Sequence, residues 1–590
     1  MLIAVKSRND ALRVATLRRI QPTVVLLAVI LASSSSSSLP ARTGRLAAPE
    51  TASADVTPAA IPAAPMGWNS WNSFSNLIDA KIAMQQAKAL VDSGMKAAGY
   101  EYVVIDEGWW KGTRDGEGNI TVDPVQWPAL KSGDRAGDMA NIAVYIHGLG
   151  LKAGIYTDVG KYGCGYAGPD IGPKFLGTGS EGHYERDFEQ FAKWGFDYVK
   201  VDWCGGSDEK LIGSVQYAEI ARAIQRAESV TGRRLYFSIC EWGSQRPWNW
   251  APGVGGSAAN IWRTGGDIVE PVVEQAQDEA HLKRIVTLKN VLNAFDAGVH
   301  PDGQHTGYYN DLDMMVVGMR GMTEPWERIH VGLWALSSAP LMVGADLTHL
   351  EAPSLALLTN RELLAVHHDP LGLQAIKVAE PQPGLQVWAK PLADPGKRAV
   401  VLLNRTDTAA PIAVDWARLG LIPGPANVRD LLAGRDLGSP ESSFSATVPA
   451  QDLVMLVVSG RASPAALYGA SANGNERIGG SVAEPCGNCP AGQSVKIGGN
   501  MALSFRNIKS AGTQAIVRVM YRNRSHTAVV ARLAVNGDQT TGVAFPPTGD
   551  QSRAVALLLT LRGGDQPNVL EFSAPCGAVV ALEGLAVSAW

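Results

Sequence analysis

A lysine and an aspartate two positions apart could do chemistry at the end of one short apolar segment. Lys200 and Asp202 lie in a β-branched run that stops at two glycines. Because side chains alternate along a strand, both should project from the face opposite to Val199 and Val201. A neighbouring ammonium group favours the ionised carboxylate, which is the form that a nucleophile requires. The alternative is a surface ion pair at a strand end, which would contribute little to stability.

Other apolar segments also end in polar or aromatic side chains. They supply Trp68, Asp106 and Glu107, Tyr156 and Asp158, Glu241, and Arg263 with Asp267. Such a set suits an uncharged, polyhydroxylated substrate, because hydroxyl groups take charged hydrogen bonds while a sugar ring packs on an aromatic wall. No single fragment proves this, but the set is hard to explain by structural roles alone.

These side chains need a scaffold that brings strand ends together, and the first half of the chain alternates strand-like and helix-like segments. The expected strands are 66–68, 102–106, 153–156, 198–202, 235–240, 261–263, 308–311 and a stretch around 339–343. Helices are expected at 81–95, with Asp79 as N-cap, and at 183–193. Eight strands with helical crossovers predict an α/β fold, a (β/α)8 barrel, whose catalytic residues collect at the carboxyl ends of the strands.

After about Leu371 the helical periodicity disappears. Strand-like runs at 385–389, 399–403 and 453–458, separated by turn residues, predict an antiparallel β domain. Residues 459–464 are expected to be a linker, and the rest predicts a jelly-roll-like β-sandwich. The expected parts are therefore a signal and lead-in (1–60), the barrel (61–370), an antiparallel β-sandwich domain (371–460) and a C-terminal, carbohydrate-binding-like β-sandwich (465–590).

The N-terminus has the pattern of an export signal. Basic residues precede the apolar run Val24–Ala32, which is too short to span a bilayer and is followed by six serines. We therefore expect a secreted protein, extracellular or periplasmic, with no membrane segment. Export makes disulfides permissible for the six cysteines, whose pairing the sequence does not fix.

Composition excludes some partners. A net charge of −4 without a basic stripe argues against nucleic acid. His183, His300 and His305 have no metal-triad spacing, so neither a metal nor another cofactor is expected. Thirteen of the 16 tryptophans lie between Trp68 and Trp334, which indicates aromatic walls in the first domain or else a tryptophan-rich core. The oligomeric state cannot be deduced.

Taken in order, the motifs resemble those of the α-galactosidases of glycoside hydrolase family 27. The resemblance covers residues 65 to 370, the following β domain is the family's usual companion, and the last domain is similar to carbohydrate-binding sandwiches of bacterial members. The matching pieces are Met66-Gly67-Trp68, Ile105-Asp106, Gly154-Ile155-Tyr156-Thr157-Asp158, Lys200-Val201-Asp202, Cys240-Glu241-Trp242, Trp262-Arg263 with Asp267, and Asn310-Asp311-Leu312-Asp313-Met314.

The resemblance implies a double displacement on a terminal α-D-galactosyl residue. Asp202 would be the nucleophile and Asp267 the general acid/base, with carboxyl groups roughly 5–5.5 Å apart. Cys164 and Cys204 would form a disulfide beside the pocket, the alternative being two unlinked buried thiols. The implied substrate-binding residues are Trp68 against the sugar, Tyr156 against the nucleophile, and Asp106, Glu107, Lys200, Trp203, Glu241 and Arg263.

Two positions bear on the choice of sugar. Glu241 would contact a 2-hydroxyl and leave no space for an acetamido group, although Ser244 is smaller than the residue often found there. Glu107 replaces the family's usual second aspartate. Its extra methylene would crowd the 5-hydroxymethyl group of galactose, as in the family's β-L-arabinopyranosidases, unless the loops adjust. The substrate is thus a galactose- or arabinopyranose-terminated oligo- or polysaccharide. A non-catalytic sugar-binding protein is a remote alternative, because both carboxylates are present.

Overall fold

The computed structural model describes residues 61–164, 178–256, 259–269, 285–575 and 577–590. The expected signal and lead-in lie outside these residues. In the described part of the chain, no helix is long and apolar enough to cross a membrane.

Eight parallel strands form the expected barrel. Their order is β10 (Leu341–Val343), β1 (Met66–Asn69), β2 (Tyr102–Ile105), β5 (Lys152–Asp158), β6 (Tyr198–Asp202), β7 (Tyr236–Cys240), β8 (Ile261–Arg263) and β9 (Tyr309–Asp311). Just after β9, Met315 bridges in parallel to Val343 of β10, and its backbone N–H donates to the Met342 carbonyl at 2.7 Å. This bridge closes the circle, and all eight expected strands are present.

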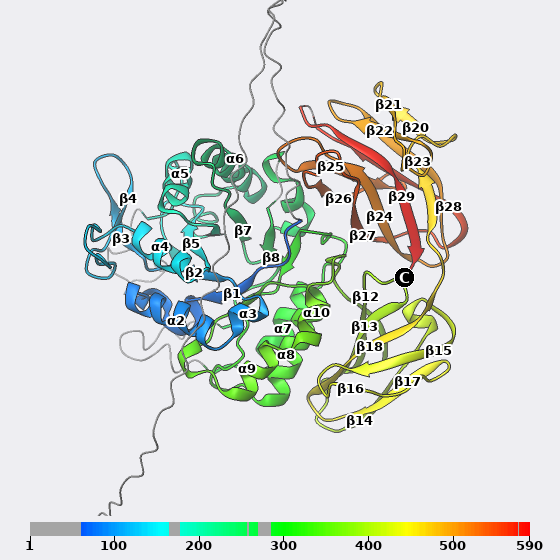
Figure 1. Cartoon of the computed structure of the whole chain (residues 1–590), viewed down its shortest axis with the longest axis horizontal. Coiled ribbons are helices and arrows are strands. Elements are labelled where there is room, and N and C mark those ends of the chain that lie inside the picture. The colour runs from blue at the N-terminus through cyan, green and yellow to red at the C-terminus, as the bar shows by residue number, and fades with distance from the viewer. Residues whose placement is uncertain (1–60, 165–177, 257–258, 270–284, 576) are drawn as a thin grey trace, which may run out of the picture. The chain divides into compact units, whose positions relative to one another are not determined.

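Helices pack outside the strands of the barrel (Figure 1). They are α1 (Trp71–Phe74), α2 (Ala80–Asp92), α3 (Met95–Ala98), α4 (Ala140–Gly148), α5 (Tyr184–Trp194), α6 (Gly213–Thr231), α7 (Leu288–Gly298), α8 (Glu324–Ser337), α9 (Ala352–Leu358) and α10 (Arg361–His367). Asp79 caps α2 as expected, accepting from the Ile82 N–H at 2.7 Å. The helix expected to continue to Met95 ends earlier, because Gly94 takes a left-handed φ of 84° that breaks the helical backbone. A hairpin of β3 (Trp110–Arg114) and β4 (Ile120–Val122) is inserted after β2.

The barrel interior is filled by aromatic side chains from several strands. Tyr102, Tyr198, Tyr236 and Tyr309 share one buried cluster, in which the rings of Tyr198 and Tyr236 stack 5.7 Å apart. Because inward positions alternate along a strand, Tyr198 on this inner face places Lys200 and Asp202 on it as well. Six of the barrel tryptophans are fully buried, so the tryptophan cluster is mainly core: Trp68, Trp109, Trp110, Trp127, Trp262 and Trp334.

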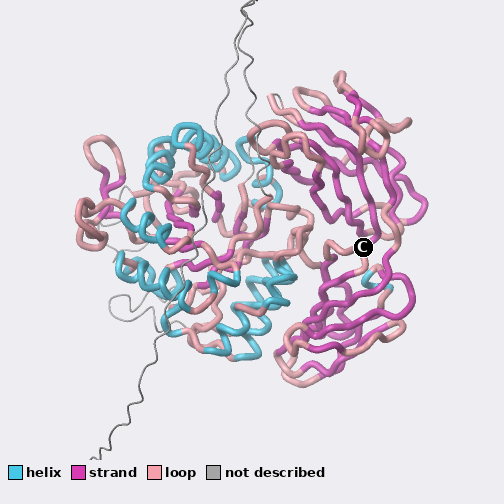
Figure 2. Tube along the Cα trace, viewed as in Figure 1, coloured by secondary structure: helices cyan, strands magenta, loops and turns pink. Residues whose placement is uncertain are grey.

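The rest of the chain is antiparallel, and Figure 2 shows almost only strands and loops there. One sheet contains β11 (Ile376–Gln382), β12 (Leu385–Pro391), β13 (Lys397–Asn404), β18 (Asp452–Ala462), β15 (Leu421–Asp430) and β16 (Arg435–Asp436), and β14 (Ala410–Asp415) pairs with β17 (Ser443–Val448). Strand β18 runs to Ala462 and pairs with β13 and β15. Most of the expected linker is therefore strand.

The last part is a two-sheet sandwich, as expected, with its own apolar core. One sheet contains β19 (Ala466–Gly469), β21 (Ala483–Pro485), β22 (Gln493–Ile497), β29 (Val580–Ala589), β24 (Gln514–Arg522) and β27 (Arg553–Thr560). The other contains β20 (Glu476–Ile478), β23 (Ala502–Ser510), β28 (Gly564–Ser573), β25 (Val529–Val535) and β26 (Asp538–Phe545).

Candidate active site

Lys200 lies between two carboxylates at the carboxyl end of β6. Its Nζ is 3.0 Å from Oδ2 of Asp106 and 3.4 Å from Oδ1 of Asp202. All three side chains are buried. The amide of Asn69 donates a further hydrogen bond to Oδ2 of Asp106 at 2.8 Å. The expected face of β6 is therefore an ion-pair cluster inside the barrel and not a surface pair.

Burial and Lys200 act on the Asp202 carboxyl in opposite directions. Burial, the larger effect, raises the pKa of Asp202 to about 6, while Lys200 lowers it. The proximity of Lys200 alone would predict a pKa of Asp202 below the usual range. Because burial has the larger effect, the lysine only limits the rise of this pKa. Asp202 remains mostly ionised at neutral pH. Oδ1 of Asp202 has no hydrogen bond to any described residue.

Arg263 organises the opposite side of the site. Its Nη2 contacts Oδ1 of Asp267 at 3.1 Å and Oδ2 of Asp313 at 2.9 Å. Arg263 and Asp313 are buried, whereas the Asp267 side chain is 34% exposed. Burial raises the pKa of Asp313 to about 7, and Arg263 opposes that rise. Asp267 thus sits at the solvent side of a buried ion pair.

Asp313 is a site residue that had no expected role. Its Oδ2 also accepts the backbone N–H of Ile268 at 2.6 Å, so it fixes the segment that carries Asp267. Its φ of 83° is unusual for a non-glycine residue. The feature of the sequence that could have indicated Asp313 as a site residue is its position two residues after the end of β9 at Asp311.

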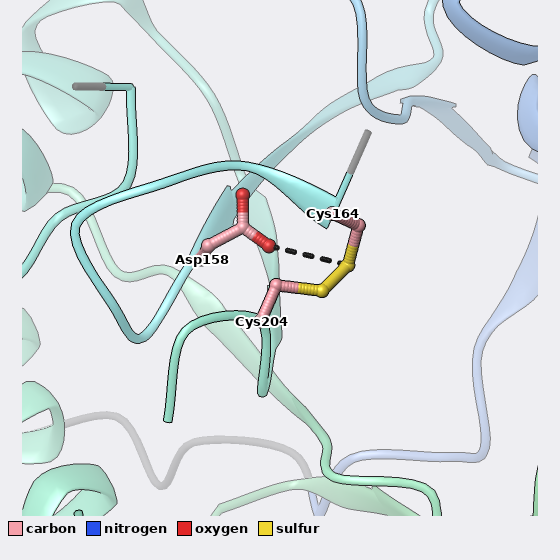
Figure 3. A group of neighbouring side chains, drawn as sticks. All are labelled: Asp158, Cys164 and Cys204. Carbon is pink, nitrogen blue, oxygen red and sulfur yellow. Dashed lines mark hydrogen bonds between the residues drawn. A yellow bond between two sulfur atoms is a disulfide. The ribbon is translucent and has the colours of Figure 1, made fainter. Parts of the chain in front are cut away.

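A disulfide lies against the ends of β5 and β6 (Figure 3). Cys164 and Cys204 are bonded, as expected, and Sγ of Cys164 is 3.2 Å from the Tyr156 hydroxyl and 3.9 Å from Oδ2 of Asp202. The Tyr156 hydroxyl donates to Oδ1 of Asp158 at 2.7 Å. Tyr156 is therefore held beside the candidate nucleophile.

Asp158 is fully buried in this group and was not among the expected binding residues. Burial first, and then the charges of Glu107 and Asp202, raise its pKa well above the usual range, so the protonated form is favoured. Its Oδ2 has no hydrogen bond among the described residues. The strand-end position of Asp158 was visible in the sequence, but its protonation depends on neighbours from other strands.

Glu107 is buried beside the loop that carries the disulfide. Its backbone N–H donates to Oδ1 of Asp106 at 2.9 Å. A Cβ atom at Gly163 would lie 2.9 Å from Oε1 of Glu107, so the glycine leaves the space that this carboxylate occupies. The loop after β5 thus leaves room for the longer side chain.

Trp68 and Trp203, the two tryptophans expected to contact the sugar, do not present a ring face at the site. Trp68 is fully buried, and its Nε1 donates to the Ala345 carbonyl at 2.9 Å, so no ring face of Trp68 is exposed to receive the sugar. Trp203 stacks on Tyr217 of α6 at 5.8 Å. The structure therefore places Trp203 on the helix side of the sheet, away from the site, because its position alternates with Asp202.

Glu241 and Cys240 complete the end of β7. Glu241 is fully buried and accepts hydrogen bonds from the Ser244 hydroxyl and the Gln245 N–H. Cys240 is a buried free thiol, and Nη1 of Arg263 lies 3.6 Å from its sulfur. The barrel mouth therefore gathers Asp106, Glu107, Tyr156, Lys200, Asp202, Glu241, Arg263 and Asp267.

Two groups of potential metal ligands occur among the described residues, and both contain bonded cysteines. Asp158 lies near Cys164 and Cys204, and Glu583 lies near Cys486 and Cys489. Because each cysteine pair forms a disulfide, no thiolate is available for a metal. The second disulfide joins the cysteines whose pairing the sequence left open, and Cys576 lies outside the described residues.

Comparison with known proteins identifies similar chains. A family model described as alpha galactosidase A matches residues 63–369, one described as the alpha galactosidase C-terminal beta sandwich domain matches 382–458, and one described as the alpha-galactosidase CBM13 domain matches 502–587. Alpha-galactosidase A of Cellvibrio japonicus is 38% identical over 409 residues, covering 67% of this chain and 92% of the relative. The crystal structure of alpha-galactosidase I from Mortierella vinacea is similar with a TM-score of 0.57 and 29% identity, covering 68% of this chain and 98% of that one.

Proposed function

Since the chain belongs to the alpha galactosidase A family, within glycoside hydrolase family 27, we propose that it is a secreted, retaining exo-glycosidase that removes terminal α-D-galactosyl residues. Its glycosidase character follows from the family. Secretion rests on the N-terminal pattern, and the retaining course rests on the pair Asp202 and Asp267. The substrate would be the galactose end of an oligo- or polysaccharide.

One observation carries the proposal: buried polar atoms without hydrogen bonds gather at the carboxyl ends of neighbouring strands. Within the described residues these atoms are Oδ2 of Asp158, Oε1 of Glu241 and Nε of Arg263, and beside them Oδ1 of Asp202 has the ion pair with Lys200 but no hydrogen bond. Buried polar groups are normally satisfied, so such a set needs a partner. The hydroxyl groups of a sugar would satisfy these atoms, and a charged substrate would not match their mixed signs.

The first chemical step would use both carboxyl groups. An ionised oxygen of Asp202 forms a bond to the anomeric carbon while the bond to the departing oxygen breaks, and Asp267 gives its proton to that oxygen. The raised but moderate pKa of Asp202, about 6, keeps it ionised at neutral pH. The partial exposure of Asp267 lets the leaving group depart toward solvent.

The second step would return the enzyme to its starting state. Asp267 removes a proton from water, the resulting oxygen attacks the anomeric carbon, and the bond to Asp202 breaks. Two inversions give net retention. A retaining mechanism of this kind requires the carboxyl groups of Asp202 and Asp267 to lie roughly 5–5.5 Å apart. Asp313 supports the acid/base role of Asp267, because it holds both Arg263 and the backbone next to Asp267.

A second candidate substrate is a β-L-arabinopyranoside, and Glu107 is the residue that favours it. The side chain is buried at the pocket, where one extra methylene competes with a 5-hydroxymethyl group. A misfit of this size is worth about 1–3 kcal/mol, enough to change the preferred sugar. The space at Gly163 works in the opposite direction, since it gives the longer carboxylate room beside the disulfide loop.

The deciding experiment compares kcat/KM on p-nitrophenyl α-D-galactopyranoside and p-nitrophenyl β-L-arabinopyranoside, for the wild type and Glu107→Asp. A preference for the galactoside that Glu107→Asp leaves unchanged supports the α-galactosidase and rejects the steric role of Glu107. A preference for the arabinoside that the substitution reverses supports the second candidate. If the wild type hydrolyses neither glycoside, the proposal fails.

A further inference from the structure

The outer face of one sheet of the C-terminal sandwich carries a basic cleft that contains none of the barrel-mouth residues. Lys496 of β22 and Arg522 of β24 are both register partners of Ala581, on the strand β29 that runs between them. Register partners project to the same face, and the adjacent positions Val495 and Tyr521 belong to the apolar core. The side chains of Lys496, Ala581 and Arg522 therefore point outward.

A small side chain between two long cations forms the cleft. Neighbouring strands lie about 4.8 Å apart, so Lys496 and Arg522 start roughly 10 Å from each other with only the Ala581 methyl group between them. The cleft has a volume of about 70 Å³, and Arg524 lines it as a third cation. A water molecule needs about 10–15 Å³ of such a volume, so the cleft has room for an anionic group and part of the molecule that carries it.

The cations of the cleft outnumber its carboxylates. Lys496 pairs with Glu484 at 2.5 Å. The hydrogen bond from Lys496 is the largest cause that holds the pKa of Glu484 below its usual range, and the charge of Arg524 acts in the same direction. Arg524 also contacts Asp550 at 2.6 Å, but both side chains are exposed, so this pair is weak. Glu484 is therefore an anion beside two cations.

Arg522 is held in place by a buried carboxylate. Its Nη2 contacts Oε1 of Glu583 at 2.6 Å, and Glu583 is only 2% exposed. The same Nη2 lies 3.2 Å from Sγ of Cys486. Nε of Arg522 is buried and has no hydrogen bond to any described residue. The guanidinium is thus oriented by one corner, and its donors exceed the acceptors that surround it.

We propose that this cleft binds the carboxylate group of a uronic acid residue in a polysaccharide. Arg522 presents a planar fork that matches a carboxylate, and Lys496 has three N–H donors, of which Glu484 takes one. Charge-assisted hydrogen bonds of this kind are stronger than those to a neutral hydroxyl group. The site is made of sandwich residues alone, so it does not depend on the reaction proposed for the barrel.

The rim of the cleft favours a sugar as the carrier of the carboxylate. Val579, which is 45% exposed, and Pro485 line the cleft with apolar surface, on which the C–H face of a sugar ring can pack. The family model that matches residues 502–587 is described as the alpha-galactosidase CBM13 domain. A neutral sugar would leave the cations without a partner, so the carboxylate should decide which sugar binds.

The test is calorimetric titration of the full chain with trigalacturonic acid and with its methyl ester, which keeps the sugar and removes the charge. We expect the ester to bind at least about tenfold more weakly than the acid. Binding of the acid should weaken as the salt concentration rises, because the cleft is open to solvent. Sodium acetate and D-galactose are titrated as competitors that carry only the charge or only the sugar.

Two variants and a matched control locate the site. Lys496→Ala should weaken binding of the acid about tenfold. Ala581→Asp, which places a carboxylate between the two cations, should abolish it. Lys509→Ala removes the same charge from an exposed pair with Asp565 on the other sheet and should leave binding unchanged. None of these residues lies at the barrel mouth, so kcat/KM on p-nitrophenyl α-D-galactopyranoside should be the same in all three variants.

The inference is overturned if the ester binds as tightly as the acid, or if acetate competes as well as galacturonate. It is also overturned if Lys509→Ala loses as much affinity as Lys496→Ala, because binding would then follow net charge alone. If Lys496→Ala does not fold, Ala581→Asp must abolish binding for the inference to hold. Failure of the glycosidase assay with intact binding of the acid would contradict the proposed function and leave this site standing.

Discussion

Asp158 and Asp202 are register partners on neighbouring parallel strands, and their carboxyl groups contact the same sulfur atom. Sγ of Cys164 lies 3.6 Å from Oδ1 of Asp158 and 3.9 Å from Oδ2 of Asp202. Two adjacent buried carboxyl groups cannot easily both be ionised. Asp158, which has no cation within ion-pair distance among the described residues, is the one expected to carry the proton.

Asp158→Asn should therefore be a mild substitution. Asparagine is neutral, like the protonated acid, and its amide oxygen can still accept the Tyr156 hydroxyl. We expect kcat/KM at neutral pH to fall by no more than about tenfold, since the net value of one neutral hydrogen bond is about 1 kcal/mol. Asp158→Ala, which removes the acceptor, should lose more. Equal losses in the two variants would mean that Asp158 acts as an anion.

The pH profile should report Asp202. Its pKa of about 6 predicts that kcat/KM falls as the pH drops below about 6, because the protonated carboxyl cannot attack. Lys200 lowers this pKa, so Lys200→Met should move the acid limb upward by about 1 to 3 pH units as well as reducing the rate. Lys152→Met is the control, since Lys152 pairs with the exposed Glu101. An unmoved acid limb in Lys200→Met would show that another group controls it.

Asp202→Ala tests the nucleophile directly. Removing the attacking oxygen should abolish hydrolysis of an activated galactoside, while the thermal unfolding midpoint shows whether the barrel still folds. Retention of most of the wild-type rate would make the assignment of Asp202 wrong.

The buried pair of Arg263 and Asp313 should matter for stability as well as for activity. Asp313→Asn leaves a buried guanidinium partly uncompensated, which costs about 3–5 kcal/mol of unfolding free energy. Asp296→Asn is the matched control, because the pair of Arg405 with Asp296 is more exposed and should be worth at most about 1 kcal/mol. Denaturant unfolding of both variants measures the difference. Similar losses would contradict the burial argument.

His330 should make the barrel sensitive to acid. It is fully buried against Trp334, and burial lowers its pKa to about 3. Because the folded pKa lies below the unfolded value of about 6.5, protons bind the unfolded chain first, and stability falls as the pH drops from 6.5 toward 3. His330→Phe should recover about 2 kcal/mol at pH 5 relative to pH 7. His349→Gln, at an exposed position, is the control for removing a histidine outside the core.

The strands were predictable because each is an apolar run that stops at polar or glycine residues. Asp202 followed from that pattern with the spacing of Lys200, and Asp267 from the family resemblance. Interactions between strands were not predictable from one segment. The sequence could not show that burial would outweigh Lys200 at Asp202, nor that Asp313 would hold Arg263. Trp203 was included among the binding residues implied by the family resemblance, although alternation along a strand already placed it on the other face.

The disulfide between Cys164 and Cys204 links the assembly of the pocket to the compartment in which the chain folds. Its sulfur contacts Tyr156 and Asp202, so the bond is part of the wall around the candidate nucleophile. Thiols remain reduced in a cytosol kept by glutathione and thioredoxin. A chain that kept both thiols reduced would lose the covalent link between the loop after β5 and the end of β6 beside Asp202.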